Sequence, residues 1–273
     1  MRSPTLPRAG VAGVAKNTSW QGGLTWIAAV KSSRVRAVAL STLTPAQKAA
    51  RSTVALKALM AVTGLIMIGY LLAHMYGNLK IFAGEAAFND YAHHLRILGE
   101  PLLPRSGALW VFRVVLLASV FGHMFAAFNL WARATKARGG VSRYQSKRAR
   151  AGVQRSYASF TLRWGGIVIL LFVIYHLMHL TWNIVASGGP AAEPYQRVVN
   201  GFQVWWVVAG YTIAMLAVGF HLRHGTWSAL TTLGLNTSAT ARRRLNLLAY
   251  VVAGVITVGF LLPPYAIAFG LMG

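Results

Sequence analysis

Histidine is the residue type in this sequence best suited to metal chemistry, and its placement is uneven. Of the eight histidines, six lie within or at the ends of long apolar segments: His74, His123, His176, His179, His221 and His224. Ionisable side chains inside a bilayer are costly, so those found there usually face the interior of a helix bundle and serve a function. A single one is most often a hydrogen-bonding residue between helices. One in each of four consecutive segments favours metal ligation instead.

The absence of cysteine narrows the chemistry further. With no thiol in the sequence, the chain cannot by itself supply thiolates to an iron–sulfur cluster. Histidine is therefore the one strong transition-metal ligand that it offers in quantity.

The elements that carry these histidines are apolar runs long enough to cross a membrane. The sequence is 56% hydrophobic and only 11% charged. About 20 apolar residues span ~30 Å of hydrocarbon, and runs of that length occupy roughly 55–79, 108–132, 162–186, 203–224 and 246–270. We therefore predict an all-α membrane protein with a bundle of five transmembrane helices, the last of them kinked or broken by Pro263 and Pro264.

The basic residues predict the orientation of the bundle. Of 27 Lys and Arg residues, nine lie in 1–57, nine in 133–163 and four in 223–244, so that 22 are on one side, whereas all four acids fall in the two loops on the other. The positive-inside bias places the N-terminus in the cytoplasm. We expect a basic cytoplasmic extension over 1–53 and a membrane domain over 54–273. The net charge of +23 then reflects topology, or a docking surface, and we expect no nucleic-acid binding.

The depth of each histidine predicts how they pair. At 1.5 Å per residue, His74 and His176 lie in the outer halves of outward-running helices. His123 lies toward the middle or inner half of its helix, and His221 lies near the inner end of the fourth. Two stacked bis-histidine sites would suit a transmembrane electron path, because a haem iron with two axial histidines has no position left for oxygen and transfers electrons.

Small residues accompany the histidines in the first four spans. Gly64 and His74 are separated by the same interval as Gly166 and His176, which indicates a repeated helix pair. Glycines beside ligands let helices approach a flat macrocycle, and ordinary small-residue helix packing explains them equally well. The glycines concerned are Gly64, Gly69, Gly122, Gly165, Gly166 and Gly219.

Residues 55–270 resemble the five-helix cytochrome b membrane subunit of succinate:quinone and menaquinol:fumarate oxidoreductases. The resemblance rests on an ordered set of segments: LLAHMYGNL, GEAAFN, FGHMFAAF, GGIVILLFVIYH and FHLRHGTWSALTTLG. It implies that one histidine from each of helices one to four ligates one or two b-type haems. By position these are His74, His123, His176 and His221, with helix one paired to three and helix two to four.

The resemblance leaves the ligands and the cofactor open in two respects. His179 follows His176 by one turn and His224 follows His221 by three residues, so either is an alternative ligand. Some anchors of these complexes hold fewer haems or none, and the alternative cofactor is a non-haem iron or iron–sulfur centre with thiolates from a partner chain.

The resemblance also implies partners, substrate and location. A flavoprotein subunit and an iron–sulfur subunit would dock on the cytoplasmic face of a bacterial cell membrane, and electrons from succinate would pass through this multi-pass chain to quinone. Succinate oxidation itself would belong to the partners. The basic loops suit either such docking or simple solvation.

Quinone reduction needs hydrogen-bond donors in a mostly apolar pocket near the membrane surface. Two groups of residues are candidates. On the inner side they are Arg223, His224, Trp227 and Ser228, although Arg223 is equally suited to hold a haem propionate or to anchor the interface. On the outer side they are Tyr91, His94 and Glu100, which singly are more typical of polar loop residues.

Two other functions compete with this interpretation. A cytochrome b anchor of another respiratory oxidoreductase would share the histidines, but the GEAAFN and HGTW segments favour the succinate family. A transporter or structural anchor would use the histidines for proton relay or packing. The presence or absence of a haem spectrum separates these classes.

Overall fold

The computed structural model describes Thr44, residues 52–137 and residues 153–272. Most of the predicted extension over 1–53, and the centre of the basic 133–163 segment, lie outside these residues. The division at residue 53 therefore stays a prediction.

Five long helices organise the described part of the chain, which contains no strand. They are α3 (Thr53–Leu79), α5 (Gly107–Lys136), α6 (Val153–His176), α8 (Trp205–Thr232) and α9 (Ala239–Ala268). Each of the five includes a stretch long and apolar enough to cross a bilayer. Serine side chains begin two of them, because Ser52 and Ser238 accept hydrogen bonds from the backbone amides of Ala55 and Ala241. The predicted all-α membrane bundle is confirmed.

The third span ends earlier than the apolar run predicted. After His176 the helix widens into a π-helical turn, Leu177–Thr181, in which the amide of Trp182 donates to the carbonyl of Leu177. Asn183 then takes a left-handed conformation, with φ of 55°. The apolar residues that follow are consequently not helical, and the predicted end at residue 186 is wrong.

The paired prolines do not break the fifth helix. α9 continues through Pro263 and Pro264 to Ala268, and both prolines are buried against their neighbours. Membrane helices tolerate proline because neighbouring helices and local adjustments satisfy the freed backbone groups. The predicted break is therefore wrong, since that expectation considered the helix alone, whereas the predicted kink stays a prediction.

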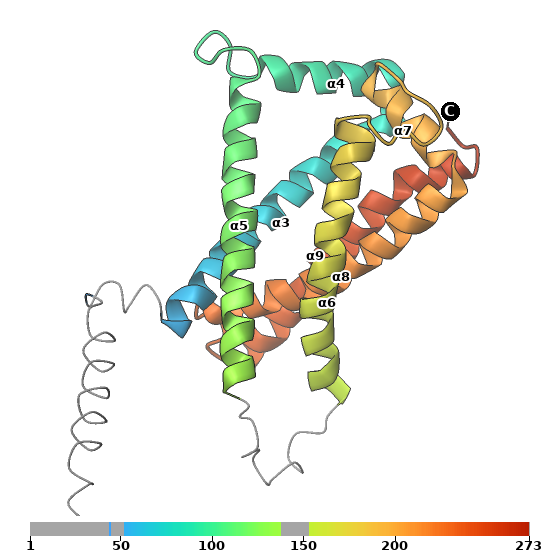
Figure 1. The fold of residues 1–273 in the computed structure, drawn as a ribbon. Helices are drawn as coiled ribbons and strands as arrows, with labels where there is room; N and C mark the ends of the chain where they lie inside the picture. The colour runs from blue at the N-terminus through green and yellow to red at the C-terminus, as the bar shows by residue number, and fades with distance from the viewer. Residues whose placement is uncertain (1–43, 45–51, 138–152, 273) are drawn as a thin grey trace, which may run out of the picture. The chain divides into compact units, whose positions relative to one another are not determined.

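The helices form an up-and-down bundle (Figure 1), and α3 and α8, which each pack against three of the other long helices, are its central pair. α3, α6 and α9 run in one direction, and α5 and α8 return. α8 packs against α9, α6 and α3, while α5 packs mainly along α3. Within the described residues α5 and α6 make no extensive contact with each other. The central pair therefore connects two flanking helices that carry predicted ligands.

Short helices close one end of the bundle, where the sequence suggested only loops. They are the 3₁₀ turn η1 (Lys80–Ala83), α4 (Glu85–Ile97) and α7 (Pro194–Phe202). The side chain of Asn89 accepts a hydrogen bond from the backbone amide of Tyr195 at 3.1 Å, and the rings of Phe88 and Tyr195 pack edge to face. These contacts join α4 to α7 at what we call the α4–α7 end.

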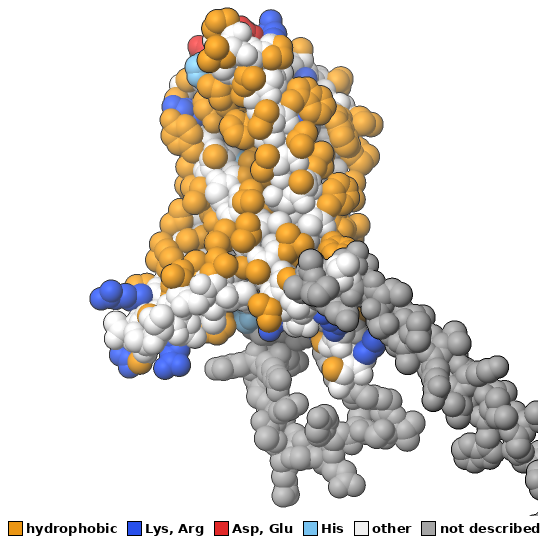
Figure 2. All heavy atoms as spheres, turned by 90° about the vertical axis from the view of Figure 1, so that its left-hand side faces the viewer, with side chains coloured by type: hydrophobic (Ala, Val, Ile, Leu, Met, Phe, Trp, Pro, Cys, Tyr) orange, Lys and Arg blue, Asp and Glu red, His pale blue; other side chains and the backbone are white. Residues whose placement is uncertain are grey.

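The surface separates apolar and charged side chains. Figure 2 shows hydrophobic side chains over the middle of the visible face, with acidic side chains at one extremity. On α5 the exposed apolar residues include Trp110, Phe112, Phe121 and Phe125. All four acids lie on or beside α4 and α7. This arrangement suits a helix bundle surrounded by lipid, with polar groups at its ends.

Candidate functional site

His123 on α5 and His221 on α8 lie side by side and are called here the α5–α8 pair. Their ring centroids are 6.3 Å apart. Glycines from two other helices lie beside them: a Cβ added at Gly64 or Gly166 would lie 3.5 Å from Cε1 of His123 or 3.8 Å from Cε1 of His221, respectively. The two glycines thus keep side-chain bulk away from the imidazoles.

Hydrogen bonds orient the His123 ring. Its Nδ1 lies 3.1 Å from the backbone carbonyl of Met60 and 3.3 Å from the hydroxyl of Thr63. The Thr63 hydroxyl is 2.7 Å from the carbonyl of Leu59, to which it donates its proton. Because carbonyls only accept, Nδ1 of His123 must carry the imidazole proton. Nε2 then has a free electron pair, which is the form that binds a metal.

His74 on α3 and His176 on α6 form a second pair, the α3–α6 pair. Their ring centroids are 5.9 Å apart. The His74 ring stacks on Tyr70 at 5.3 Å and contacts Phe260 at 5.6 Å. Like the α5–α8 pair, both rings are half-buried.

The two pairs lie at different depths in the bundle, and the axial distance between them is about the same when it is measured along α3, α6 or α8. On α3, His74 lies 11 residues beyond Thr63, which contacts His123, or about 16 Å along the axis. On α6, His176 lies ten residues beyond Gly166, which is about 15 Å. On α8, ten residues separate His221 from Tyr211, which contacts His176. The separation is about half of a ~30 Å hydrocarbon layer.

This arrangement gives a physical reason for the repeated ten-residue interval. α3 and α6 each place a glycine beside the α5–α8 pair and a histidine in the α3–α6 pair. Gly122 and Gly219 instead face Thr63 and Thr257 on neighbouring helices, so they serve helix packing.

The alternative ligand on α6, His179, occupies a different environment. Its ring is only 2% exposed, and its Nδ1 lies 3.0 Å from the hydroxyl of Tyr211. Its Nε2 is buried without a hydrogen-bond partner, and a Cβ at Gly201 would lie 2.6 Å from that atom. This close approach leaves no space for a metal at Nε2. The geometry therefore favours His176 over His179 as a ligand.

The alternative on α8, His224, does not belong to either ring pair. It is half-buried and lies about one turn from His221, and the ring that meets His123 is that of His221. Its ligand role stays a prediction.

The separations suit a metal held between two imidazoles. Metal–nitrogen bonds of about 2 Å, with roughly 1 Å more from each nitrogen to its ring centre, would place two imidazoles that share one metal about 6 Å apart. Both pairs have this spacing. Among the described residues no three His, Asp or Glu side chains gather into a metal site. Each position thus offers two imidazole ligands from this chain, which suits a haem, whereas a non-haem centre would take its remaining ligands from a partner chain and stays the alternative.

Arg223 is already engaged by the neighbouring helix. Its guanidinium donates to the side chains of Asn246 and Tyr250, at 3.2 and 2.9 Å, and lies over the Tyr250 ring. These contacts tie α8 to α9. Arg223 therefore contacts α9 in this structure. A role in quinone binding for Arg223, His224, Trp227 and Ser228 stays a prediction.

The outer quinone candidates differ in their surroundings. Tyr91 packs against α3, where a Cβ at Gly77 would approach its ring to 2.8 Å. His94 and Glu100 are exposed. A quinone role for these three residues stays a prediction.

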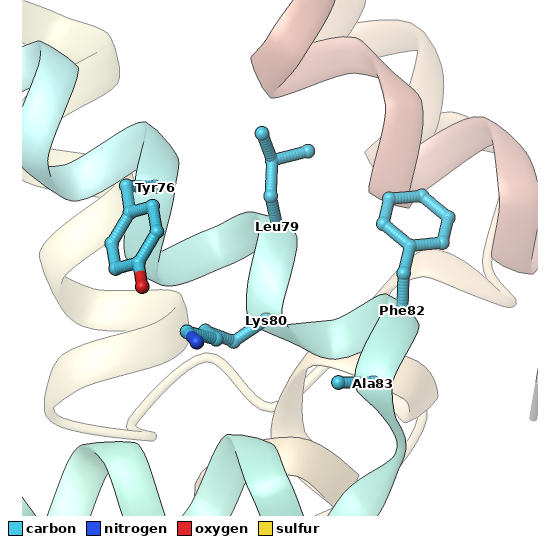
Figure 3. Close-up of a pocket in the computed structure, with 5 residues that line it drawn as sticks. All are labelled: Tyr76, Leu79, Lys80, Phe82 and Ala83. Atoms are coloured by element: carbon cyan, nitrogen blue, oxygen red, sulfur yellow. The ribbon is translucent and has the colours of Figure 1, made fainter.

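A shallow apolar hollow lies beside Tyr91, on residues that the sequence did not single out. It is lined by Tyr76, Leu79, Lys80, Phe82 and Ala83 (Figure 3). The amine of Lys80 lies 5.0 Å from the centre of the Tyr76 ring, and that ring meets Tyr91 edge to face. The sequence signal for this hollow was an aromatic residue, Tyr76, four positions before Lys80 at the end of an apolar span.

Tyr211 was also absent from the sequence-based candidates. It is 6% exposed, and its hydroxyl lies near both His176 and His179. The signal for it was weak, because a tyrosine in an apolar span is usually a packing residue.

Comparison with known proteins supports the resemblance given by the sequence segments. No family model and no solved structure matches the chain. Among curated proteins, the succinate dehydrogenase cytochrome b558 subunit of Bacillus subtilis (strain 168) is 24% identical over 182 residues, which cover 66% of this chain and 80% of that protein. This five-helix, multi-pass membrane protein is thus similar to a succinate dehydrogenase cytochrome b subunit.

Proposed function

We propose that this chain is the membrane anchor of a succinate:quinone oxidoreductase and carries electrons from an iron–sulfur subunit to membrane quinone. The observation that carries the proposal is the presence of two histidine pairs, on four different helices, about 15 Å apart along the bundle. Ring packing alone gives centroid separations in the same range, so it is the repetition of the histidine pair at two depths that favours metal ligation over packing or proton relay. The named relative supports the same interpretation.

The proposed cofactors are two b-type haems. His123 and His221 would hold one, and His74 and His176 the other. When bound, such haems would supply reversible one-electron transfer. The protein would supply the imidazole nitrogens of these histidines, the hydrogen bond from His123 to the Met60 carbonyl that fixes its ring, and apolar surroundings that exclude water.

The proposed orientation follows from charge. All four acids lie at the α4–α7 end, and most basic residues lie toward the other end or in the adjoining segments. The positive-inside rule puts the end opposite α4 and α7 in the cytoplasm of a bacterium. On this proposal the flavoprotein and iron–sulfur subunits dock there, nearest the α5–α8 pair, and the α3–α6 pair lies farther out.

The proposal is tested by separating the two half-reactions of the assembled complex. Replacing His123, His176 or His221 with Ala should block quinone reduction and leave succinate oxidation by an artificial soluble acceptor largely intact, because substrate oxidation belongs to the soluble partners. Assembly is checked in the same samples. If each variant assembled and reduced quinone at the parental rate, the histidines would be packing residues and the electron path would fail.

A further inference from the structure

The hydroxyl of Tyr211 lies between two histidines of one helix. It is 3.3 Å from Nδ1 of His176 and 3.0 Å from Nδ1 of His179. His176 directly precedes the π-helical turn Leu177–Thr181 and His179 lies within it, three residues on, and both side chains reach the same tyrosine on α8. π-Turns inside helices frequently mark functional sites.

The cluster is closed and aromatic. Tyr211 and His179 are 6% and 2% exposed. The ring of Tyr211 packs edge to face against Phe172, Phe202 and Tyr175. Polar groups buried in such surroundings are held by their hydrogen bonds, because water is not available as a substitute. The contacts of the Tyr211 hydroxyl therefore fix both imidazoles.

Proton counting gives these contacts a direction, on the basis of the proposed function. If Nε2 of His176 binds a metal, its Nδ1 carries the proton and donates to the Tyr211 oxygen. Tyr211 has one proton of its own, which is then free to be donated to Nδ1 of His179. His179 accepts there, and its own proton resides on Nε2, against Gly201.

We propose that Tyr211 and His179 are positioning residues for the α3–α6 pair, forming a directed chain from His176 through Tyr211 to His179 that orients the His176 ring and strengthens its bond to the metal. An accepting partner at Nδ1–H makes an imidazole more basic. The oxidised metal gains more from a basic ligand than the reduced metal does. The chain should consequently lower the reduction potential at the α3–α6 pair and leave the α5–α8 pair unaffected, since that lies about 15 Å away.

The test compares two substitutions that each remove one phenolic hydroxyl from the same cluster. Tyr211→Phe removes the central group of the chain. Tyr175→Phe is the matched control: its ring stacks on His179 at 5.5 Å and meets Tyr211 edge to face, but the hydroxyl that contacts Nδ1 of His176 and of His179 is that of Tyr211. In the assembled complex, redox titration followed by haem absorbance gives the potential of each haem. Low-temperature electron paramagnetic resonance reports the orientation of the axial rings.

Tyr211→Phe should raise the potential of one haem and change its resonance signal, while Tyr175→Phe leaves both haems as in the parent. His179→Leu should act like Tyr211→Phe, and His179→Asn, which keeps an acceptor near the Nδ1 position, should restore the parental values. Equal effects of the two tyrosine substitutions, or no shift from Tyr211→Phe, would overturn the inference while leaving the electron path intact. An assembled complex without haem would overturn the proposed cofactor and this inference together.

Discussion

Replacing His123 with Ala should remove one haem and spare the other. His123 belongs to the α5–α8 pair, and the α3–α6 pair begins about 16 Å farther along α3. Sites more than about 7–10 Å apart without shared partners usually respond independently. Haem content per subunit should therefore fall by half, and the α3–α6 site should keep its absorption band and its potential.

The bundle itself should survive this substitution. The ring contributes one hydrogen bond to the Met60 carbonyl, worth about 1 kcal/mol, and it is only half-buried. This loss is small beside the ~5–15 kcal/mol of a typical folded protein. Retained assembly would show that cofactor loss does not follow from unfolding.

The assay is haem quantification per polypeptide, with a reduced-minus-oxidised spectrum of the same sample. His93→Ala is the control, because His93 is exposed on α4, outside the long helices. It should retain the full haem content. Loss of all haem from an assembled His123→Ala complex would contradict the independence of the pairs, and unchanged content would show that His123 is not a ligand.

Three further predictions concern the topology of the chain, the glycine beside His221 and the contact between α8 and α9. A reporter inserted within 138–152 should be cytoplasmic, because the flanking charges are basic, and an external reporter would reverse the proposed orientation. Gly166→Val should lower haem content at the α5–α8 pair, since its side chain would point at a ligand ring. Gly165→Val, with no atom within 4 Å of its Cβ position, should retain the haem. Equal haem loss in the two variants would show that valine acts by disrupting the helix. In thermal unfolding, the double variant with Arg223→Met and Tyr250→Phe should lose roughly 1 kcal/mol less stability than the sum of the two single variants, because both changes remove the same hydrogen bond. Additive losses would show that the contact adds no stability.

Much of the bundle could be predicted from sequence because bilayer thickness fixes the length of a spanning helix. Depth along each span also indicated which histidines lie at the same level, since His74 and His176 approach the same end from helices running in one direction. The family resemblance added the same pairs by position. The ligand role of these residues is still a prediction.

The features that the sequence did not reveal depend on how each helix is rotated about its axis and on local departures from the α-helix. The π-turn after His176 changes the direction of His179, and apolar periodicity does not signal such a turn. The partners of Arg223 lie on α9, 23 and 27 residues away, so they depend on how α8 and α9 are aligned. Tyr211 resembles any packing tyrosine until the fold places two imidazoles beside it.

If electrons from succinate enter haems held by this chain, a difference spectrum of the complex should show it. The purified, assembled complex is reduced with succinate, and its spectrum is recorded against the oxidised sample before and after a quinone is added. Low-spin b-type haem bands should appear with succinate and fade when quinone is added. An assembled complex that oxidises succinate and reduces quinone without any haem absorbance would contradict it.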